Sequence, residues 1–554
     1  METTLAGEAF STEERRLLEP HFTNFDSHVF ALTNLPETVK GALFARYSRS
    51  SKSLRRLFLD EFADKVHPQA PAAAGVGVER ADKLYARVFN EYGDDSVAQL
   101  GGAHLACEYV SNVLTKVLEW GRLMAYLEQS TRYVPYTDKL HGHWRYHVPA
   151  ELSPDGTLRD RYERAMDAAF DTYARLLDPM QAYFARRYPK APGDSDGVHR
   201  SATRAKALDT LRGMLPAATQ SNVGIYGTGQ AFEALLLRMR ANPLAEVRAC
   251  ADQMLAELRK VIPAFLARVD QPDRGGRWSE YLAQTRDRID AEAARILAGE
   301  TPESRAEVTL TSFDPEGEIK IAAAALYASS DLPDDQLLRV ARRMTADERA
   351  AVLRAYAGER ANRRHRPGRA FERATYRFDV LTDYGAFRDL QRHRLLTLEW
   401  QPLTTHHGYT EPDAIRDAGF AAEWERVMDA SADLHAAIVE AGLTAIAPYA
   451  VAMAYRVRFY LEMNAREAMH LIELRTAPQG HPSYRRVCQE MHRLIGEQAG
   501  HRAIAAAMQF ADHSEVELER LKSERALERR RADASSQRNP TTEGTEDIEE
   551  SNVS

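Results

Sequence analysis

The chain has 554 residues, of which 44% are hydrophobic and 28% charged, and its net charge is −8. The length exceeds that of one ordinary domain and the composition is that of a soluble globular protein, while the negative charge argues against a general nucleic-acid binder. Three cysteines, no apolar run of membrane-spanning length and no signal-peptide pattern predict a cytoplasmic protein without a disulfide framework or membrane association.

An internal repeat organises the chain. The segment VFALTNLPETVKGALFARYSRSS (29–51) resembles VTLTSFDPEGEIKIAAAALYASS (308–330), and 228–254 resembles 465–491 in the same way. Two similar units of this length are far longer than the units of a solenoid, so the repeat indicates domain duplication.

The repeat also suggests where the domains begin and end. We expect a first copy at 1–270, a polar connector with its own short helix at 271–305, and a second copy at 306–515. Residues 533–554 are polar and acidic, which predicts a disordered tail.

Hydrophobic spacing predicts the secondary structure within each copy. Residues 160–180 carry apolar side chains at three- and four-residue intervals, which is typical of a helix packed on one face. The β-branched and aromatic runs at 374–384 and 457–463 predict strands. The expected fold class is α+β, with two tandem copies of a helix-rich domain that carries small antiparallel sheets.

Three adjacent side chains suggest an anionic ligand. Arg392, His393 and Arg394 follow a run that reads as buried structure, and grouped guanidinium groups repel one another unless an anion joins them. Taken alone, such a triplet is equally compatible with a solvated helix face. His406 and His407 have no partner at metal-ligand spacing, so we expect no metal site.

Flanking segments give this triplet a context. Together with RRHRPGRAFERATYRFDV (363–380) and MNAREAMHLIELR (463–475), it resembles the flavin-dependent thymidylate synthase family. The hallmark of that family is Arg-His-Arg, seven residues and Ser, within a longer segment that ends in Glu-Gln-Ser-x-Arg-Tyr. A later Asn-Ala-Arg…Leu-x-Leu-Arg element completes it.

The hallmark is divided between the two copies. The second copy keeps Arg-His-Arg but has Pro402 in place of the Ser, whereas EWGRLMAYLEQSTRYVPY (119–136) of the first copy keeps the Glu-Gln-Ser-x-Arg-Tyr part. The first copy also keeps Arg212, where the second has Thr444. We interpret this division as complementary specialisation after duplication.

The resemblance implies an FAD-dependent methyltransferase that converts dUMP to dTMP, with NADPH and methylenetetrahydrofolate as co-substrates. Within it, Arg475 would be catalytic, because it would polarise the uracil ring. The implied FAD-binding residues are Arg392, His393, Arg394, Asn464, Arg466 and Glu372. The implied substrate-binding residues are Glu128, Gln129, Ser130, Arg132, Arg212 and Arg475. The expected assembly is a homodimer of pseudo-tetrameric arrangement, with small-molecule substrates and no nucleic-acid or membrane partner.

Two features depart from the family pattern. Asp389 stands where the family usually has a Gln three residues before the triplet, and the flavin-contacting segment upstream is altered to RPGRAFE (366–372). The alternatives are therefore a non-catalytic homologue that binds flavin or nucleotide, and a flavoenzyme that methylates uracil in another substrate such as RNA.

Overall fold

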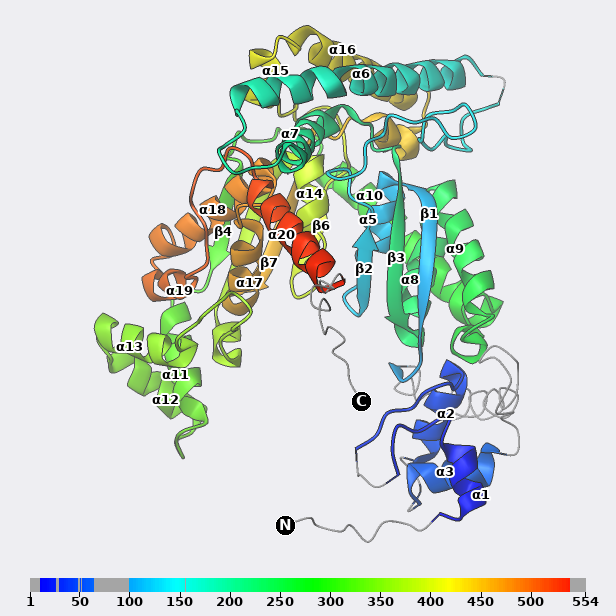
Figure 1. The fold of residues 1–554 in the computed structure, drawn as a ribbon, viewed down its shortest axis with the longest axis vertical. Helices are drawn as coiled ribbons and strands as arrows, with labels where there is room; N and C mark the ends of the chain where they lie inside the picture. Colours follow the sequence, from blue (N-terminus) through cyan, green and yellow to red (C-terminus); the bar gives the residue numbers. More distant parts are fainter. Residues whose placement is uncertain are drawn as a thin grey trace, which may run out of the picture.

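The computed structural model describes residues 10–25, 29–47, 50, 52–63, 99–154 and 156–538. Two antiparallel sheets, one from each copy, stand side by side (Figure 1). In the first sheet the order β1-β3-β2 is built from β1 (Gly102–Ser111), β2 (Met124–Glu128) and β3 (Gln220–Thr228). In the second, the order β4-β5-β7-β6 is built from β4 (Val308–Phe313), β5 (Thr375–Asp383), β6 (Thr397–Trp400) and β7 (Arg456–Asn464).

Both copies use one order of elements, so the duplication extends to the fold. A strand, a short helix, a loop and a strand come first: β1, α5 (Asn112–Leu118) and β2 in the first copy, and β5, α14 (Tyr384–Leu390) and β6 in the second. A central strand then leads into a longer helix: β3 into α8 (Gly229–Arg240), and β7 into α17 (Ala465–Arg475). Helices α2 (Glu37–Tyr47) and α11 (Gly317–Tyr327) fall in the other pair of similar segments.

The sharp strand-to-helix turns follow from capping side chains. In each copy the residue between strand and helix is the N-cap, and its side-chain oxygen accepts a hydrogen bond from a backbone N–H of the first helical turn. These four bonds are Ser111 to Leu114 (2.9 Å), Thr228 to Ala231 (3.3 Å), Asp383 to Ala386 (2.9 Å) and Asn464 to Glu467 (2.9 Å). The caps fix where the following helices point, and those helices carry most of the site.

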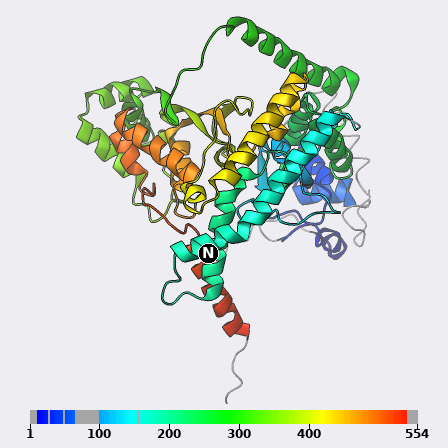
Figure 2. The same cartoon turned by 90° about the horizontal axis from the view of Figure 1, so that it is seen from above.

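Long helices from each copy join the two halves. The predicted helix at 160–180 is confirmed as α6 (Thr157–Arg187), which lies beside α16 (Ala421–Glu440) above both sheets (Figure 2). Phe170 and Tyr173 of α6 belong to one buried cluster with Trp424 of α16 and with the second sheet. Each of the two large cores therefore contains residues from both copies.

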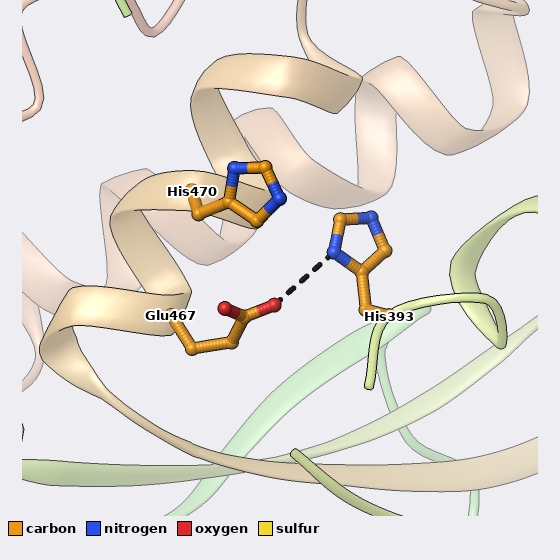
Figure 3. Close-up of side chains that lie close together, drawn as sticks. All are labelled: His393, Glu467 and His470. Atoms are coloured by element: carbon orange, nitrogen blue, oxygen red, sulfur yellow. Dashed lines mark hydrogen bonds and ion pairs between the residues drawn. The ribbon is translucent and has the colours of Figure 1, made fainter. Parts of the chain in front are cut away.

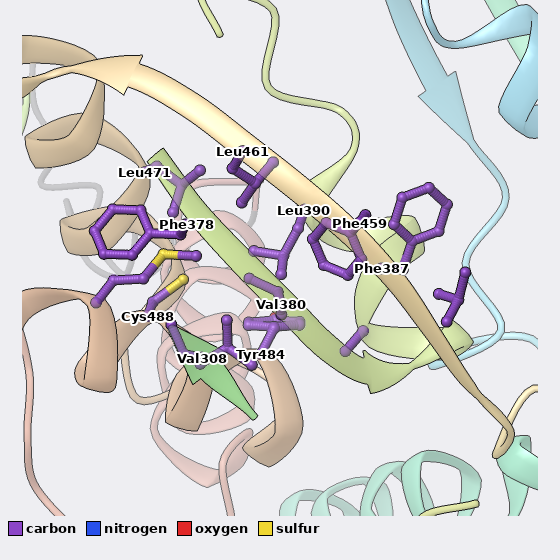
Figure 4. Close-up of a cluster of buried hydrophobic side chains, with 14 of the residues drawn as sticks. Val308, Phe378, Val380, Phe387, Leu390, Phe459, Leu461, Leu471, Tyr484 and Cys488 are labelled. Atoms are coloured by element: carbon purple, nitrogen blue, oxygen red, sulfur yellow. The ribbon is translucent and has the colours of Figure 1, made fainter. Parts of the chain in front are cut away.

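The second sheet packs its inner face on α17 and on α18 (Pro482–Glu497). Phe378 and Val380 of β5 and Leu461 of β7 pack with Cys488 of α18 in a buried hydrophobic cluster (Figure 4). The strands predicted at 374–384 and 457–463 are thereby confirmed as β5 and β7.

The remaining helices surround these two units. They are α1 (Thr12–Leu18), α3 (Leu54–Glu61), α7 (Asp196–Leu211), α9 (Ala245–Leu258), α10 (Arg277–Ile296), α12 (Asp334–Arg343), α13 (Ala346–Ala357), α15 (Asp413–Asp417), α19 (Arg502–Ala507) and α20 (Leu521–Arg538). Short turns η4 (Arg212–Met214), η5 (Pro263–Leu266), η6 (Pro272–Gly276), η7 (Arg369–Arg373) and η8 (Thr444–Ala450) connect them. No helix in the described part of the chain is long and apolar enough to cross a membrane.

Two expectations about the polar segments need correction. The connector helix is not short, since α10 runs for 20 residues. The predicted disordered tail at 533–554 is wrong for 533–538, which continue α20, and its remainder, 539–554, lies outside the described residues.

Candidate functional site

Two corresponding loops meet between the sheets. Loop 119–123 joins α5 to β2, and loop 391–396, which carries the Arg-His-Arg triplet, joins α14 to β6. Hydrogen bonds run in both directions between the copies: Gln391 Nε2 to the Lys116 carbonyl (2.7 Å), Trp120 Nε1 to the Leu398 carbonyl (3.3 Å), Arg122 Nη2 to Thr397 Oγ1 (3.1 Å) and Arg394 Nη1 to the Met124 carbonyl (2.5 Å). The triplet therefore lies at the junction of the copies.

Three arginines from both copies surround the buried carboxylate of Asp389. Arg392 Nη2 lies 2.5 Å from Asp389 Oδ1, while Arg212 Nη1 and Arg475 Nη1 lie 3.6 and 3.7 Å from its oxygens. Burial raises the pKa of Asp389, but the charges of Arg392, Arg475 and Arg212 outweigh burial and hold this pKa well below its usual range. Among the residues that the structure describes, Arg212 Nη2 is buried without a hydrogen-bond partner. We call these four residues the arginine cluster.

Glu128 holds the neighbouring cations in place. Its carboxylate lies 2.8 Å from Arg388 Nη2, 3.4 Å from Lys116 Nζ and 3.6 Å from Arg392 Nη1. Burial raises the pKa of Glu128, and the charges of Arg388, Lys116 and Arg392 lower it, with a net value of about 2. Glu128 is thus a permanent anion that positions Arg392.

The other first-copy residues of the predicted substrate set lie at different distances from this cluster. Arg132 forms two hydrogen bonds of 2.7 Å with Asp209 and donates to Tyr484 Oη of the second copy (2.9 Å). Ser130 Oγ accepts from the Arg132 backbone N–H (3.2 Å), and with Gln129 it lines an open depression over the first sheet. The structure therefore unites Glu128, Arg212 and Arg475, and leaves Gln129 and Ser130 at the margin.

His393 links the triplet to α17 (Figure 3). Arg475 Nε donates to His393 Nε2 (3.0 Å), so the ring proton is on Nδ1, which lies 3.2 Å from Glu467 Oε1. Burial and the charge of Arg475 lower the pKa of His393 well below its ordinary value, and burial raises the pKa of Glu467 to about 7. A neutral imidazole therefore contacts a carboxyl group that titrates near neutral pH.

His393, Glu467 and His470 have the composition of a metal site, but their surroundings favour an anion. Their ligand atoms lie within 4.8 Å of one another. Arg475 occupies the acceptor nitrogen of His393, however, and Arg366 Nη2 lies 3.1 Å from His470 Nδ1. A divalent cation here would be repelled by these guanidinium groups.

The residues of the predicted flavin set fit a diphosphate. In the described part of the chain neither Arg366 nor Arg394 pairs with a carboxylate, so positive charge remains around His393. Asn464 caps α17, and Arg466 lies 3.4 Å from Glu372 at the same end of this helix. These groups and the helix N-terminus offer charge-assisted donors to an anionic cofactor.

Glu467 gives a prediction about stability. Its pKa is raised above its ordinary value of 4.5 in the folded protein, so its stabilising contribution is present at low pH and is lost as the pH rises from about 4.5 to about 7. The whole shift corresponds to about 3 kcal/mol. We expect Glu467→Gln to reduce this loss, measured as the free energy of unfolding in urea at pH 5 and at pH 8. Glu462→Gln is the matched control, because the Glu462 side chain on β7 is 44% exposed. An equal loss in wild type and Glu467→Gln would contradict the assignment.

Some residues of the site were not predicted from the sequence. Glu467 and His470 lie in the segment MNAREAMHLIELR, three residues apart on a helix, and that spacing places them on one face. Asp209 likewise precedes Arg212 by three residues, which places the two side chains about one helical turn apart. Arg388 carries no such signal, because its importance comes from the distant Glu128.

Comparison with known proteins supports the duplication and the family. The family model for thymidylate synthase complementing protein matches residues 38–264 and 308–499. A UPF0159 protein of Chlamydia muridarum is 39% identical over 521 residues, which cover 93% of this chain and 98% of that protein. A UPF0159 protein of Thermoplasma acidophilum is 31% identical over 88% of this chain and 97% of its own length.

A shorter relative carries a functional name. The flavin-dependent thymidylate synthase of Mycobacterium bovis is 30% identical over 185 residues, which cover 33% of this chain and 68% of that protein. Because the family model matches both repeats and more than half of the chain, the chain belongs to the thymidylate synthase complementing protein family.

Proposed function

We propose that the chain is a flavin-dependent thymidylate synthase, which converts dUMP to dTMP at one composite site built by both copies. The observation that carries this proposal is the arginine cluster, in which Arg212 of the first copy faces Arg392 and Arg475 of the second. The name of the mycobacterial relative supports the same chemistry.

The cluster has unused donors for a nucleotide. The distances of 3.6 and 3.7 Å from Arg212 and Arg475 to Asp389 are those of ion pairs without a hydrogen bond. A buried donor without a partner costs about 1–3 kcal/mol, which a phosphate or uracil oxygen would recover. In the proposed complex Arg212 binds the phosphate with Ser130 and Arg132. Arg132 contributes less, because Asp209 already engages it.

Arg475 is placed to act on the base. Its Nε donates to neutral His393, which fixes the guanidinium plane, and its Nη1 stays near Asp389. A fixed cation beside the uracil ring would stabilise negative charge that develops on the ring during methylation.

The cofactor would lie on the other side of His393. Arg392, His393 and Arg394, with Asn464, Arg466 and Glu372, would hold FAD through its diphosphate and ring edge. Bound FAD would supply the reducing equivalents, with NADPH and methylenetetrahydrofolate as co-substrates. We also propose a homodimer, in which two chains give four copies.

The test is turnover by the full-length protein. Purified protein incubated with FAD should hold about one FAD per chain, because only the second copy has the Arg-His-Arg triplet. It should then form dTMP from dUMP, measured by chromatography with NADPH and methylenetetrahydrofolate present. Protein that gains no flavin absorbance contradicts the proposal. Protein that binds flavin but forms no dTMP is instead the non-catalytic homologue.

A further inference from the structure

A pocket of about 660 Å³ lies where the equivalent elements of the opposite copies meet. The first copy supplies the loop and the long helix here, and the second copy supplies the strand. The walls of the pocket come from loop 119–123 and α8 of the first copy and from residues 396–399 at the start of β6, and Gln391, His393 and Arg394 of the second copy also line it. The loop, the helix and the strand correspond to loop 391–396, α17 and β2, which build the composite site. The volume falls within the range of about 300–1,000 Å³ that is typical of small-molecule sites.

Small residues keep this pocket open. Gly121 stands at the position of His393, so the first copy places no imidazole in the pocket, and His393 itself lines it from the second copy. A Cβ atom on Gly121 would lie 2.6 Å from Tyr126 Oη and 3.7 Å from Arg238 Nη2. Tyr126 Oη is itself fixed by donating to the Gly121 carbonyl (3.0 Å). A side chain could therefore not be added here without moving Tyr126.

Arg238 brings an unpaired positive charge to the pocket. Three glutamates also line it, of which Glu119 pairs with Lys116 and Glu233 with Arg268, and the third is Glu399. The counterpart of Arg238, Arg475, faces Asp389, but Val117 stands at the position of Asp389 in the first copy. Arg238 consequently forms no hydrogen bond or ion pair within the described residues, and its guanidinium lies 5.6 Å above the ring of Trp120. Burial lowers its pKa, since no anion offsets the lost hydration.

Aromatic side chains form the rest of the recognition surface. Trp120 and Trp278 line the pocket and remain 38% and 53% exposed. Trp120 is held in position by its hydrogen bond to the Leu398 carbonyl and by an edge contact with Trp400 (5.6 Å). Arg122, bonded to Thr397 and without a carboxylate partner in the described part of the chain, lies at the rim. Exposed aromatic faces beside two guanidinium groups suit a flat base that carries one phosphate.

We propose that this pocket is a second nucleotide site, which binds a nucleoside monophosphate with its phosphate on Arg238 and its base against Trp120. His393 and Arg394 of the triplet line this pocket, but none of the arginine cluster does, so the groups proposed to bind and polarise dUMP are absent from it. The inference does not rest on turnover at the composite site.

The test is equilibrium dialysis of radiolabelled dUMP and AMP with full-length protein. All chains carry Arg212→Gln, so that the composite site does not obscure the count. We expect a bound monophosphate near one per chain, and at least a tenfold loss of affinity when Arg238→Gln is added. Arg240→Gln, on the same helix but paired with Asp252, is the matched control and should leave binding unchanged.

Two further results separate the outcomes. Arg238→Gln removes an unpaired cation, so its thermal unfolding midpoint without ligand should not fall below that of its parent. Binding of neither nucleotide, or binding that Arg238→Gln does not weaken, overturns the proposal. Loss of bound FAD on Arg238→Gln would also overturn it, because the pocket, which His393 and Arg394 also line, would then take the dinucleotide.

Discussion

Replacing Asp389 with asparagine is expected to destabilise the folded chain by about 3–5 kcal/mol, because the change breaks a buried ion-pair network and leaves its cations uncompensated. The carboxylate lies 2.5 Å from Arg392 and also faces Arg212 and Arg475. The same replacement frees the point on which three guanidinium groups converge, so an oxyanion should bind there. Inorganic phosphate should accordingly stabilise Asp389→Asn more than wild type.

The measurement is urea unfolding at pH 7 with and without phosphate. The low pKa of Asp389 means that its contribution is present above the ordinary carboxyl range and is lost as the pH falls below it, so pH 7 reports the full effect. Asp379→Asn is the matched control. Asp379 pairs with Arg458 in a partly exposed position, where the expected cost is about 1 kcal/mol or less. Equal stability of Asp389→Asn and wild type, with no added effect of phosphate, would show that the cluster is not electrostatically coupled.

Much of the fold was predictable because local patterns determine it. The spacing of apolar residues in 160–180 gave α6, and the β-branched runs gave β5 and β7. The repeat predicted two copies of one unit. The partner of each buried face was not predictable, because periodicity identifies an apolar face and not what covers it. The packing of Phe170 with Trp424 across the copies is an example.

The candidate site was predictable where it rests on motif residues. The resemblance identified Arg212, Arg392 and Arg475, and the structure brings these residues together around one point. It identified Asp389 only as a departure, because the ion pairs that explain this residue involve side chains far apart in the sequence. Glu128 was expected to contact substrate, and the structure adds its pairing with Arg388 and Lys116.

The second pocket could not be predicted from motifs, because it depends on positions where the first copy has lost the side chains that the second copy keeps. Gly121 and Val117 carry no signal of their own, and they matter because they replace His393 and Asp389 at corresponding positions. Their effect on Arg238 becomes visible only once the loops and helices of the two copies are placed together in space.

The central claim is that one nucleotide site draws on both copies, and dUMP affinity tests it most directly. In chains that carry Arg238→Gln, so that only the composite site is measured, Arg212→Gln and Arg475→Gln should each weaken dUMP binding. Loss of a charge-assisted hydrogen bond costs about 1.5–3 kcal/mol, or about ten- to a hundredfold in affinity. Arg204→Gln, on the same helix run as Arg212 but in an exposed pair with Asp178, is the control.

Isothermal titration calorimetry of dUMP into these FAD-loaded variants gives the decisive comparison, with retained flavin absorbance as evidence of folding. A site shared between the copies predicts that Arg212→Gln and Arg475→Gln both weaken dUMP binding and that the control Arg204→Gln does not. Affinity that falls with Arg475→Gln but stays within about twofold of the parent with Arg212→Gln would contradict it, because the nucleotide would then be bound by the second copy alone.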